Sequence, residues 1–241
     1  MTSPMTSRTP IGGTAAALAL VLAGGPAAAP AGTATPAPLV AKGQIAQLED
    51  AISVILTADE DRAGYQSTSF PHWNKGRDTT DACSTRAEVL IAEAVEEPDV
   101  SAACKLTGGK WFSYYDEQTV TKQSSIEVDH VVPLAEAWGS GASAWTAERR
   151  EAYANDQAAT ATLTAVTART KREKGEQDIT GWLPPSTSAL CRYIGDWVAT
   201  KLRWGLSTDK EELEALKLFA DNSCETTMVR WTPAPGTLPP V

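Results

Sequence analysis

The residues best suited to acid–base chemistry in this 241-residue chain lie in one short segment, Glu127–Pro133. Asp129 and His130 are adjacent there at the end of an apolar run, and Pro133, which cannot extend a central strand, follows them. A neutral imidazole accepts a proton at neutral pH, and a carboxylate can hold a hard divalent cation. Because neighbours on a regular strand face opposite sides, both side chains can serve one site only if the backbone bends, as the proline allows. An Asp-His pair alone is more often a surface histidine that its neighbour neutralises.

Basic side chains are concentrated downstream of this pair. Between Arg149 and Trp204, nine basic and six acidic side chains leave a net charge of +3, whereas the whole chain carries −9. The overall charge excludes an electropositive coat for nucleic acid, but the local excess lies where a phosphodiester substrate would need it. Lys171 and Lys174 are three residues apart and therefore share one helix face. A solvated helix face is the alternative explanation of the same cluster.

The other reactive residues are few. With only two histidines, His72 and His130, the chain cannot form a site that needs three, and His72 is expected to pack with its neighbours Phe70 and Trp73. The sequence contains no His-Glu-x-x-His, no Gly-x-Ser-x-Gly, and no phosphate-loop or dinucleotide-binding motif. Zinc proteases, serine hydrolases and nucleotide-binding proteins of those types are therefore not indicated.

The N-terminus predicts secretion. Residues 1–32 carry no acidic side chain, and their apolar stretch Ile11–Ala23 has the length of a signal-peptide core but is too short to span a bilayer. Small residues follow, so we expect a signal peptide over 1–31 and a Pro/Ala linker over 32–43. A low-complexity tail on a cytosolic protein is the alternative. No other segment is long and apolar enough to cross a membrane, so we expect a released extracellular protein without a membrane partner.

An oxidising destination favours disulfides among the four cysteines. Three pairings are open, and proximity in the sequence favours Cys83 with Cys104 and Cys191 with Cys224. Each bond would close a loop of a few tens of residues and stabilise the fold by roughly 3–4 kcal/mol. The spacing is too wide for the paired Cys-x-x-Cys pattern of a zinc ribbon.

Hydrophobic periodicity predicts one α+β domain over 44–228, followed by a disordered Pro-rich tail over 229–241. The sequence Thr85-x-x-Glu88 is typical of a capping box that opens a short helix, although Val89–Ile91 could equally be a strand. Strands are expected at 110–115 and 125–132, as an antiparallel pair. Further helices are expected at 44–58, 146–154, 167–174, 191–204 and 209–220.

Several motifs occur in a characteristic order along the chain. They are Phe70–Trp73, Cys83–Arg86, Asp129–Trp138, Ser140–Ala142, Ala154–Asp156, Ala165–Thr167, Lys174-Gly175, Trp182–Pro185 and Cys191–Tyr193. Over about 64–224 the chain thereby resembles the secreted bacterial HNH-type nucleases, which are related to the C-terminal nuclease domain of GmrSD-type modification-dependent restriction enzymes. The ordered set is far more specific than any single motif in it.

The resemblance implies a ββα-metal (HNH or His-Me finger) nuclease core with surrounding helices and two disulfides. In that pattern His130 would be the general base, and Asp129 would ligate a divalent ion, Mg²⁺ in the first place and Mn²⁺ or Ca²⁺ as alternatives. Asn155 would order the loop that holds the histidine. Lys174 would contact the phosphate or the transition state.

The chain departs from the family pattern at one position. The residue three before the lysine is usually an asparagine that completes the metal site, and here it is Lys171. A protonated lysine has no acceptor and cannot be a ligand. Either Lys171 joins Arg169 and Arg172 in binding substrate, or the helix register slips so that Thr170 or Glu173 provides the ligand.

These observations together favour a monomeric, secreted, metal-dependent endonuclease. It would hydrolyse phosphodiester bonds of DNA, with RNA as a further substrate, and with little sequence preference because no base-reading module is evident. A catalytically inactive HNH-fold binding protein is the alternative that Lys171 suggests. A polysaccharide-binding protein is a third candidate because the chain has eight tryptophans, although Trp197 and Trp204 have the spacing of core residues.

Overall fold

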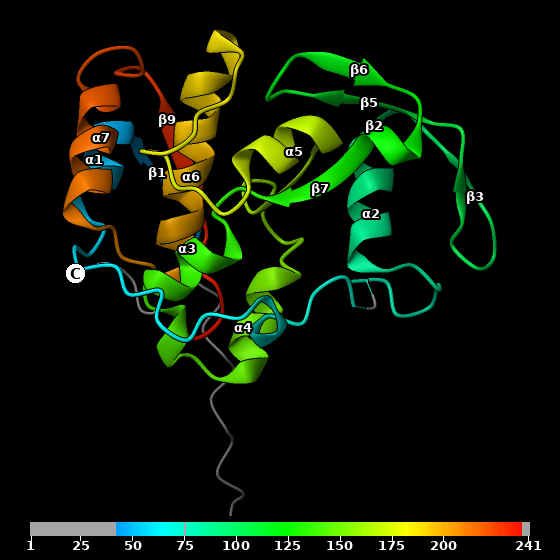
Figure 1. The fold of residues 1–241 in the computed structure, drawn as a ribbon, viewed down its shortest axis with the longest axis horizontal. Helices are drawn as coiled ribbons and strands as arrows, with labels where there is room; N and C mark the ends of the chain where they lie inside the picture. Colours follow the sequence, from blue (N-terminus) through cyan, green and yellow to red (C-terminus); the bar gives the residue numbers. More distant parts are fainter. Residues whose placement is uncertain (1–41, 75, 238–241) are drawn as a thin grey trace, which may run out of the picture. The chain divides into compact units, whose positions relative to one another are not determined.

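A computed structural model describes residues 42–74 and 76–237 (Figure 1). The predicted signal peptide and residues 32–41 of the predicted linker lie outside the described residues. The helices are α1 (Leu48–Ser53), α2 (Thr85–Ala92), α3 (Leu134–Gly139), α4 (Ala147–Ala154), α5 (Ala168–Lys174), α6 (Leu190–Trp204) and α7 (Lys210–Ala220). The strands are β1 (Gln44–Gln47), β2 (Ala94–Glu96), β3 (Asp99–Val100), β4 (Leu106–Thr107), β5 (Lys110–Ser113), β6 (Gln118–Val120), β7 (Ile126–His130), β8 (Leu163–Thr167) and β9 (Met228–Trp231). This mixture of helices and short antiparallel strands agrees with the predicted α+β class.

Strands β7 and β8 and helix α5 form the unit that carries the Asp-His pair. The two strands are antiparallel, with Ile126 opposite Thr167 and His130 opposite Leu163. Helix α5 begins directly after β8, where the Thr167 side chain accepts a hydrogen bond from the Thr170 amide as its N-cap. The helix contacts both strands, and Figure 1 shows it beside β7. β7, β8 and α5 are therefore neighbours in space, although α3 and α4 lie between the two strands in the sequence.

The predicted pairing of 110–115 with 125–132 is wrong. Strand β5 pairs with β2 on one side and with β6 on the other, and β7 pairs with β8. The chain turns back immediately after β5 because Glu117 adopts a left-handed conformation with φ 52°, which brings Gln118 opposite Ser113. The partner of β7 is thus a distant strand that the sequence analysis did not identify.

Both ends of the predicted domain also differ. Residues 44–47 are not helical but form β1, which pairs with β9 from Gln44 opposite Trp231 to Gln47 opposite Met228. The boundary at 228 and the tail from 229 are therefore wrong as far as residue 237, because Val229, Trp231 and Ala234 are buried. Alternation of buried and exposed residues explains this strand, which the proline-rich composition around it obscured. Residues 238–241 lie outside the described part of the chain.

The core has two parts. The larger one surrounds α6, whose Tyr193, Ile194, Trp197 and Val198 are fully buried as the helical stripe predicted. The smaller one packs α2 and Trp111 against the inner face of β7 and β8. The tryptophans at core-like spacing are thus internal, which leaves the polysaccharide-binding hypothesis without Trp197 or Trp204 as an exposed platform.

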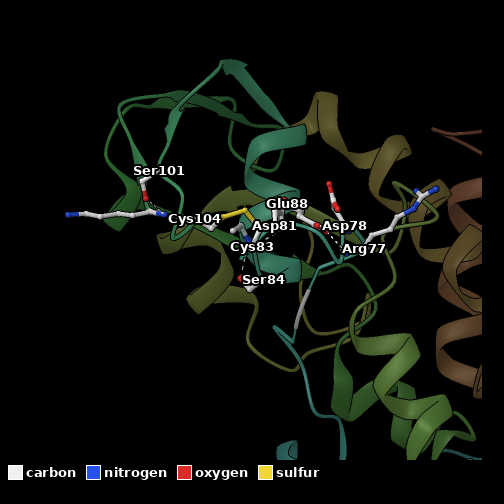
Figure 2. The surroundings of a disulfide bond; sticks show 10 residues. Arg77, Asp78, Asp81, Cys83, Ser84, Glu88, Ser101 and Cys104 are labelled. Atoms are coloured by element: carbon white, nitrogen blue, oxygen red, sulfur yellow. Dashed lines mark hydrogen bonds between the residues drawn. A yellow bond between two sulfur atoms is a disulfide. The ribbon is translucent and has the colours of Figure 1, made fainter.

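Helix α2 begins one residue earlier than the capping box implied. Ser84, rather than Thr85, is the N-cap, and its hydroxyl accepts from the Ala87 amide. Glu88 instead accepts from the amides of Arg77 and Asp78 at 2.6 and 2.8 Å, which ties the preceding loop to the helix (Figure 2). Residues 89–91 are helical, so the strand alternative does not apply.

Both disulfides of the favoured pairing are present. Cys83 bonds to Cys104 next to the start of α2 (Figure 2), and Cys191 at the start of α6 bonds to Cys224 after α7. Replacing Cys191 and Cys224 together with Ala is expected to lower the free energy of unfolding by about 3–4 kcal/mol, because the unfolded chain loses its cross-link. Urea unfolding of the variant and the parent measures this difference. An unchanged unfolding midpoint would contradict it.

A buried ionic network joins α3, α6 and α7. The ammonium of Lys201 lies 2.8 Å from a Glu136 oxygen and 2.6 Å from a Glu212 oxygen, and all three side chains are at most 2% exposed. Burial and the negative charge of Glu136 raise the pKa of Glu212 to about 7, although the attraction of Lys201 opposes this shift. The folded protein therefore holds a proton on Glu212 at pH values where the unfolded chain has lost it.

Raising the pH from 5 to 8 is accordingly expected to destabilise the fold through Glu212. A carboxyl group with a raised pKa in the folded state contributes stability at low pH and loses it as the pH rises through that pKa, by about 3 kcal/mol at most for a shift of this size. Glu212→Gln is expected to flatten this dependence in thermal melts at pH 4–8. Glu214→Gln, an exposed position on the same helix, is the matched control and should retain the parental slope.

Candidate active site

His130 ends strand β7, and a single hydrogen bond fixes its tautomer. Its Nε2 lies 2.9 Å from the carbonyl oxygen of Ala154, the last residue of α4. A carbonyl can only accept, so Nε2 carries the proton and Nδ1 is left as the acceptor. The ring is stacked between Trp73 and Tyr153, with centroids 5.3 and 6.3 Å away and interplanar angles of 23° and 21°. This is the orientation that a general base requires.

His130 is neutral at neutral pH. Burial, with smaller contributions from His72, Lys171 and Lys174, lowers its pKa to about 3, although the hydrogen bond to Ala154 opposes this shift. Only the neutral imidazole can accept a proton. A bound phosphate would bring negative charge to the same place and raise the pKa, which would make the ring a stronger base when substrate is present.

Asp129 forms a buried ion pair. Its Oδ2 accepts from the Lys174 ammonium at 2.7 Å and from the Tyr115 hydroxyl at 3.0 Å, and neither donor engages Oδ1. Lys174 also donates to the His130 carbonyl at 2.8 Å and is fully buried. Burial lowers the pKa of Lys174, and the attraction of Asp129 opposes this shift. Lys174 therefore stabilises the end of β7, and in this arrangement it is not exposed to a phosphate as the family pattern implied.

Lys171 faces the site as well. Its ammonium donates to the Val128 carbonyl on β7 at 2.7 Å and lies 5.7 Å from the Trp73 ring centroid. Thr170 and Glu173, the alternative ligands if the helix register slipped, have other partners. Thr170 hydrogen-bonds to Thr167, and a Glu173 oxygen lies 3.9 Å from the Arg169 guanidinium. The position that holds the ligand asparagine in the family pattern is thus occupied by an ammonium.

These residues do not fit a divalent metal ion. One carboxylate, Asp129, is already balanced by Lys174, and the second ligand position contributes a further positive charge through Lys171. The two lysines and the aspartate leave a net charge of +1 before any cation arrives, and a protonated lysine offers no lone pair. Among the described residues, the only cluster of at least three His, Cys, Asp or Glu side chains close enough to share a metal ion is Glu60, Asp178 and Asp209, and none of them belongs to this site.

Asn155 orders a loop, but a different one from the loop that the family pattern implied. Its Oδ1 accepts from the Asn74 amide at 3.2 Å, and its Nδ2 donates to the Pro71 carbonyl at 2.9 Å. These bonds hold segment 71–74 against the end of α4 and so place Trp73 on His130. Trp73 has φ 58°, a left-handed conformation that costs a bulky residue about 1–3 kcal/mol. The contacts of Asn155 offset part of that cost.

His72 packs against Trp73 as its neighbours suggested, with ring centroids 5.1 Å apart, and it also belongs to the same cluster as His130. Its ring meets His130 edge to face with centroids 5.8 Å apart, and it is only half-buried. Its Nδ1 donates to the Phe70 carbonyl at 2.8 Å, which leaves Nε2 as the acceptor. The sequence pattern did not indicate His72 or Tyr115 as part of the site. The available signal was that His72 is the only other histidine.

The structure does not bring Arg169 and Arg172 to His130. Both line a cavity of about 350 Å³ together with Thr167 and Ser125, at the start of β7 and the end of β8. His130 lies at the other end of the same strand pair. Of the three predicted substrate-binding residues, only Lys171 therefore lies at the Asp-His pair.

Comparisons with known proteins agree with the nuclease resemblance at the family level. Residues 91–217 match the family described as GmrSD restriction endonucleases, C-terminal domain. The chain is also 36% identical over 195 residues to a protein of the fungus Arthroderma benhamiae (strain ATCC MYA-4681 / CBS 112371) that is described as an uncharacterized secreted protein. This match covers 79% of the chain and 93% of the relative, and it extends the resemblance beyond bacterial proteins. No solved structure matches the chain.

The location of the protein follows from the same findings. The two disulfides are consistent with an extracellular protein, and the relative is described as secreted. The chain is therefore a secreted protein, as predicted. Among the residues that the structure describes, no helix is long and apolar enough to cross a membrane. Because the family match covers more than half of the sequence, the chain belongs to the family of GmrSD restriction endonuclease C-terminal domains.

Proposed function

We propose that this secreted protein is an endonuclease that cleaves phosphodiester bonds of nucleic acids as a monomer, with little sequence preference. The observation that carries the proposal is His130, whose Nδ1 is left free by the bond from Nε2 to Ala154. A neutral histidine with a fixed tautomer can take a proton from a nucleophile that attacks a phosphate, and the adjacent positive charge can attract that phosphate.

The surrounding residues have separate tasks in this proposal. Lys171 on α5 donates to the Val128 carbonyl of β7, beside the Asp-His pair, and would attract the phosphate. Asp129 and Lys174 form an internal pair that holds the strand end, and therefore His130, in place. Asn155 acts through segment 71–74, which keeps Trp73 against the imidazole.

The residues at Asp129 are poorly suited to the divalent ion that the family pattern implies. Magnesium at Asp129 would meet a carboxylate that Lys174 already neutralises, and Lys171 would repel it. The proposed function therefore depends on the proton transfer by His130 and on the lysine charge.

The proposal is tested by incubating the purified secreted protein with supercoiled plasmid DNA and with RNA of mixed sequence. Each substrate is offered with Mg²⁺, with Mn²⁺, with Ca²⁺ and with excess EDTA. Internal cleavage of either substrate is the expected result. If neither substrate is cut under any of these conditions, the endonuclease proposal is wrong.

A catalytically inactive binding protein is the second candidate. Lys171 favours it, because an ammonium stands where the family pattern has a ligand. Such a protein would retain the fold and a positive site that binds nucleic acid. Retention of labelled oligonucleotides in a filter-binding assay, without any cleavage, would support this candidate against the first.

A further inference from the structure

Two imidazoles lie side by side in the candidate active site, and each is fixed by one backbone carbonyl. His130 donates from Nε2 to Ala154, and His72 donates from Nδ1 to Phe70. The rings meet at 89° with centroids 5.8 Å apart. Each ring therefore has one nitrogen that no hydrogen bond to the described residues engages, Nδ1 of His130 and Nε2 of His72. Such a pair can accept a proton at one ring and release one at the other.

The charge around the pair suits a phosphate more than a metal ion. Lys171 and Lys174 outnumber Asp129, and the ammonium of Lys171 lies above the Trp73 ring that covers His130. An anionic phosphodiester would be attracted directly by this net positive charge. With the donor set unsuited to a divalent ion, the nucleophile has to be one that a neutral imidazole can activate without a Lewis acid.

The 2′-hydroxyl of RNA meets that requirement. It is covalently held next to the phosphorus that it attacks, so proximity replaces much of the activation that a metal ion would provide to a free water. DNA lacks this group. A site with two imidazoles and a positive charge, but without a metal-binding donor set, thus discriminates between the two nucleic acids by chemistry alone.

We propose that the site cleaves RNA by metal-independent transphosphorylation, with His130 as the base and His72 as the acid. His130 Nδ1 takes the proton of the 2′-hydroxyl as the O2′–P bond forms. The P–O5′ bond breaks, and the leaving O5′ takes a proton from His72 Nε2, which that nitrogen has first taken from solvent. The products are a 2′,3′-cyclic phosphate and a 5′-hydroxyl, and neither water nor a metal ion is consumed. This inference rests on the proposed endonuclease function and specifies its substrate.

The test uses a labelled DNA oligonucleotide that contains one ribonucleotide. The full secreted chain is incubated with it in excess EDTA, and an all-DNA oligonucleotide of the same sequence is the matched control. We expect one cut, on the 3′ side of the ribonucleotide, with a cyclic phosphate and a 5′-hydroxyl identified by mass spectrometry. The all-DNA control is expected to remain intact, and added Mg²⁺ is expected not to increase the rate.

A substitution separates the role of His72 from packing. His72→Asn retains a donor that can reach the Phe70 carbonyl but removes Nε2, so the cleavage rate is expected to fall by about 10²–10⁴-fold while the melting temperature is preserved. Lys210→Asn, at an exposed position on α7, is the control and should leave both unchanged. The product analysis of the parental protein needs no variant and decides the chemistry even if His72→Asn fails to fold.

The outcomes distinguish this inference from the function on which it rests. Cleavage of the all-DNA oligonucleotide that requires a divalent ion would overturn the inference and support the endonuclease. Absence of any cleavage, here and with the ion-supplemented plasmid, would overturn both. Parental activity in a folded His72→Asn variant would overturn the assignment of the acid.

Discussion

Replacing His130 with Ala is expected to reduce the rate of phosphodiester cleavage by about 10²–10⁴-fold, the usual cost of losing a general base. A hydrogen bond from Nε2 to the Ala154 carbonyl leaves Nδ1 of this side chain as its acceptor nitrogen. Lys174 cannot take over this role, because its ammonium is engaged with Asp129. The rate is measured under single-turnover conditions with the substrate that the parental protein cuts.

Loss of packing has to be separated from loss of the base, because His130 is stacked between Trp73 and Tyr153. His130→Gln serves as the companion variant, since its amide can still donate to the Ala154 carbonyl but accepts protons far less readily. Both variants are expected to be inactive, and His130→Gln is expected to melt closer to the parental temperature. Parental rates in either folded variant would mean that His130 is not the base.

The sequence was most informative where chemistry and local structure coincide. Asp129 and His130 were placed at a strand end before a proline bend, and the structure puts them at the end of β7. Helix α6 followed from its apolar stripe, and α5 from the segment before Gly175, where the left-handed φ of 56° ends the helix. These features depend on residues within one or two turns of each other.

The missed features depend on contacts between distant segments. Strand β8 is buried at every position, so it lacks the alternation by which a half-exposed strand is recognised, and its partner β7 lies more than thirty residues away. His72 reaches the site only because Asn155, eighty-four residues after Pro71, holds segment 71–74 against α4. The inward role of Lys174 likewise could not be seen from the charge pattern, which is the same for a solvated lysine and a buried one.

Lys171→Asn is expected to increase the affinity of the protein for divalent ions. The ammonium lies 2.7 Å from the carbonyl oxygen of Val128, the residue before Asp129 in β7. It is therefore close enough to repel a cation bound at Asp129. Two unit charges 4 Å apart repel by about 4 kcal/mol at an effective dielectric constant of 20. Removing this repulsion corresponds to about 10³-fold in affinity, since each 1.4 kcal/mol is tenfold. Titration calorimetry with Mg²⁺ and Mn²⁺ measures the difference.

Lys171→Met distinguishes the two reasons for that expected gain. Methionine removes the positive charge without supplying an oxygen, whereas asparagine removes the charge and adds a carbonyl ligand. If the charge alone excludes the ion, both variants bind it more tightly and to a similar degree. If a ligand is also needed, only Lys171→Asn binds the divalent ion more tightly than the parent. Only this variant is then expected to show ion-dependent cleavage at neutral pH. Parental affinity in both variants would mean that the ammonium is not what excludes the ion, so that the pairing of Asp129 with Lys174 would have to account for it.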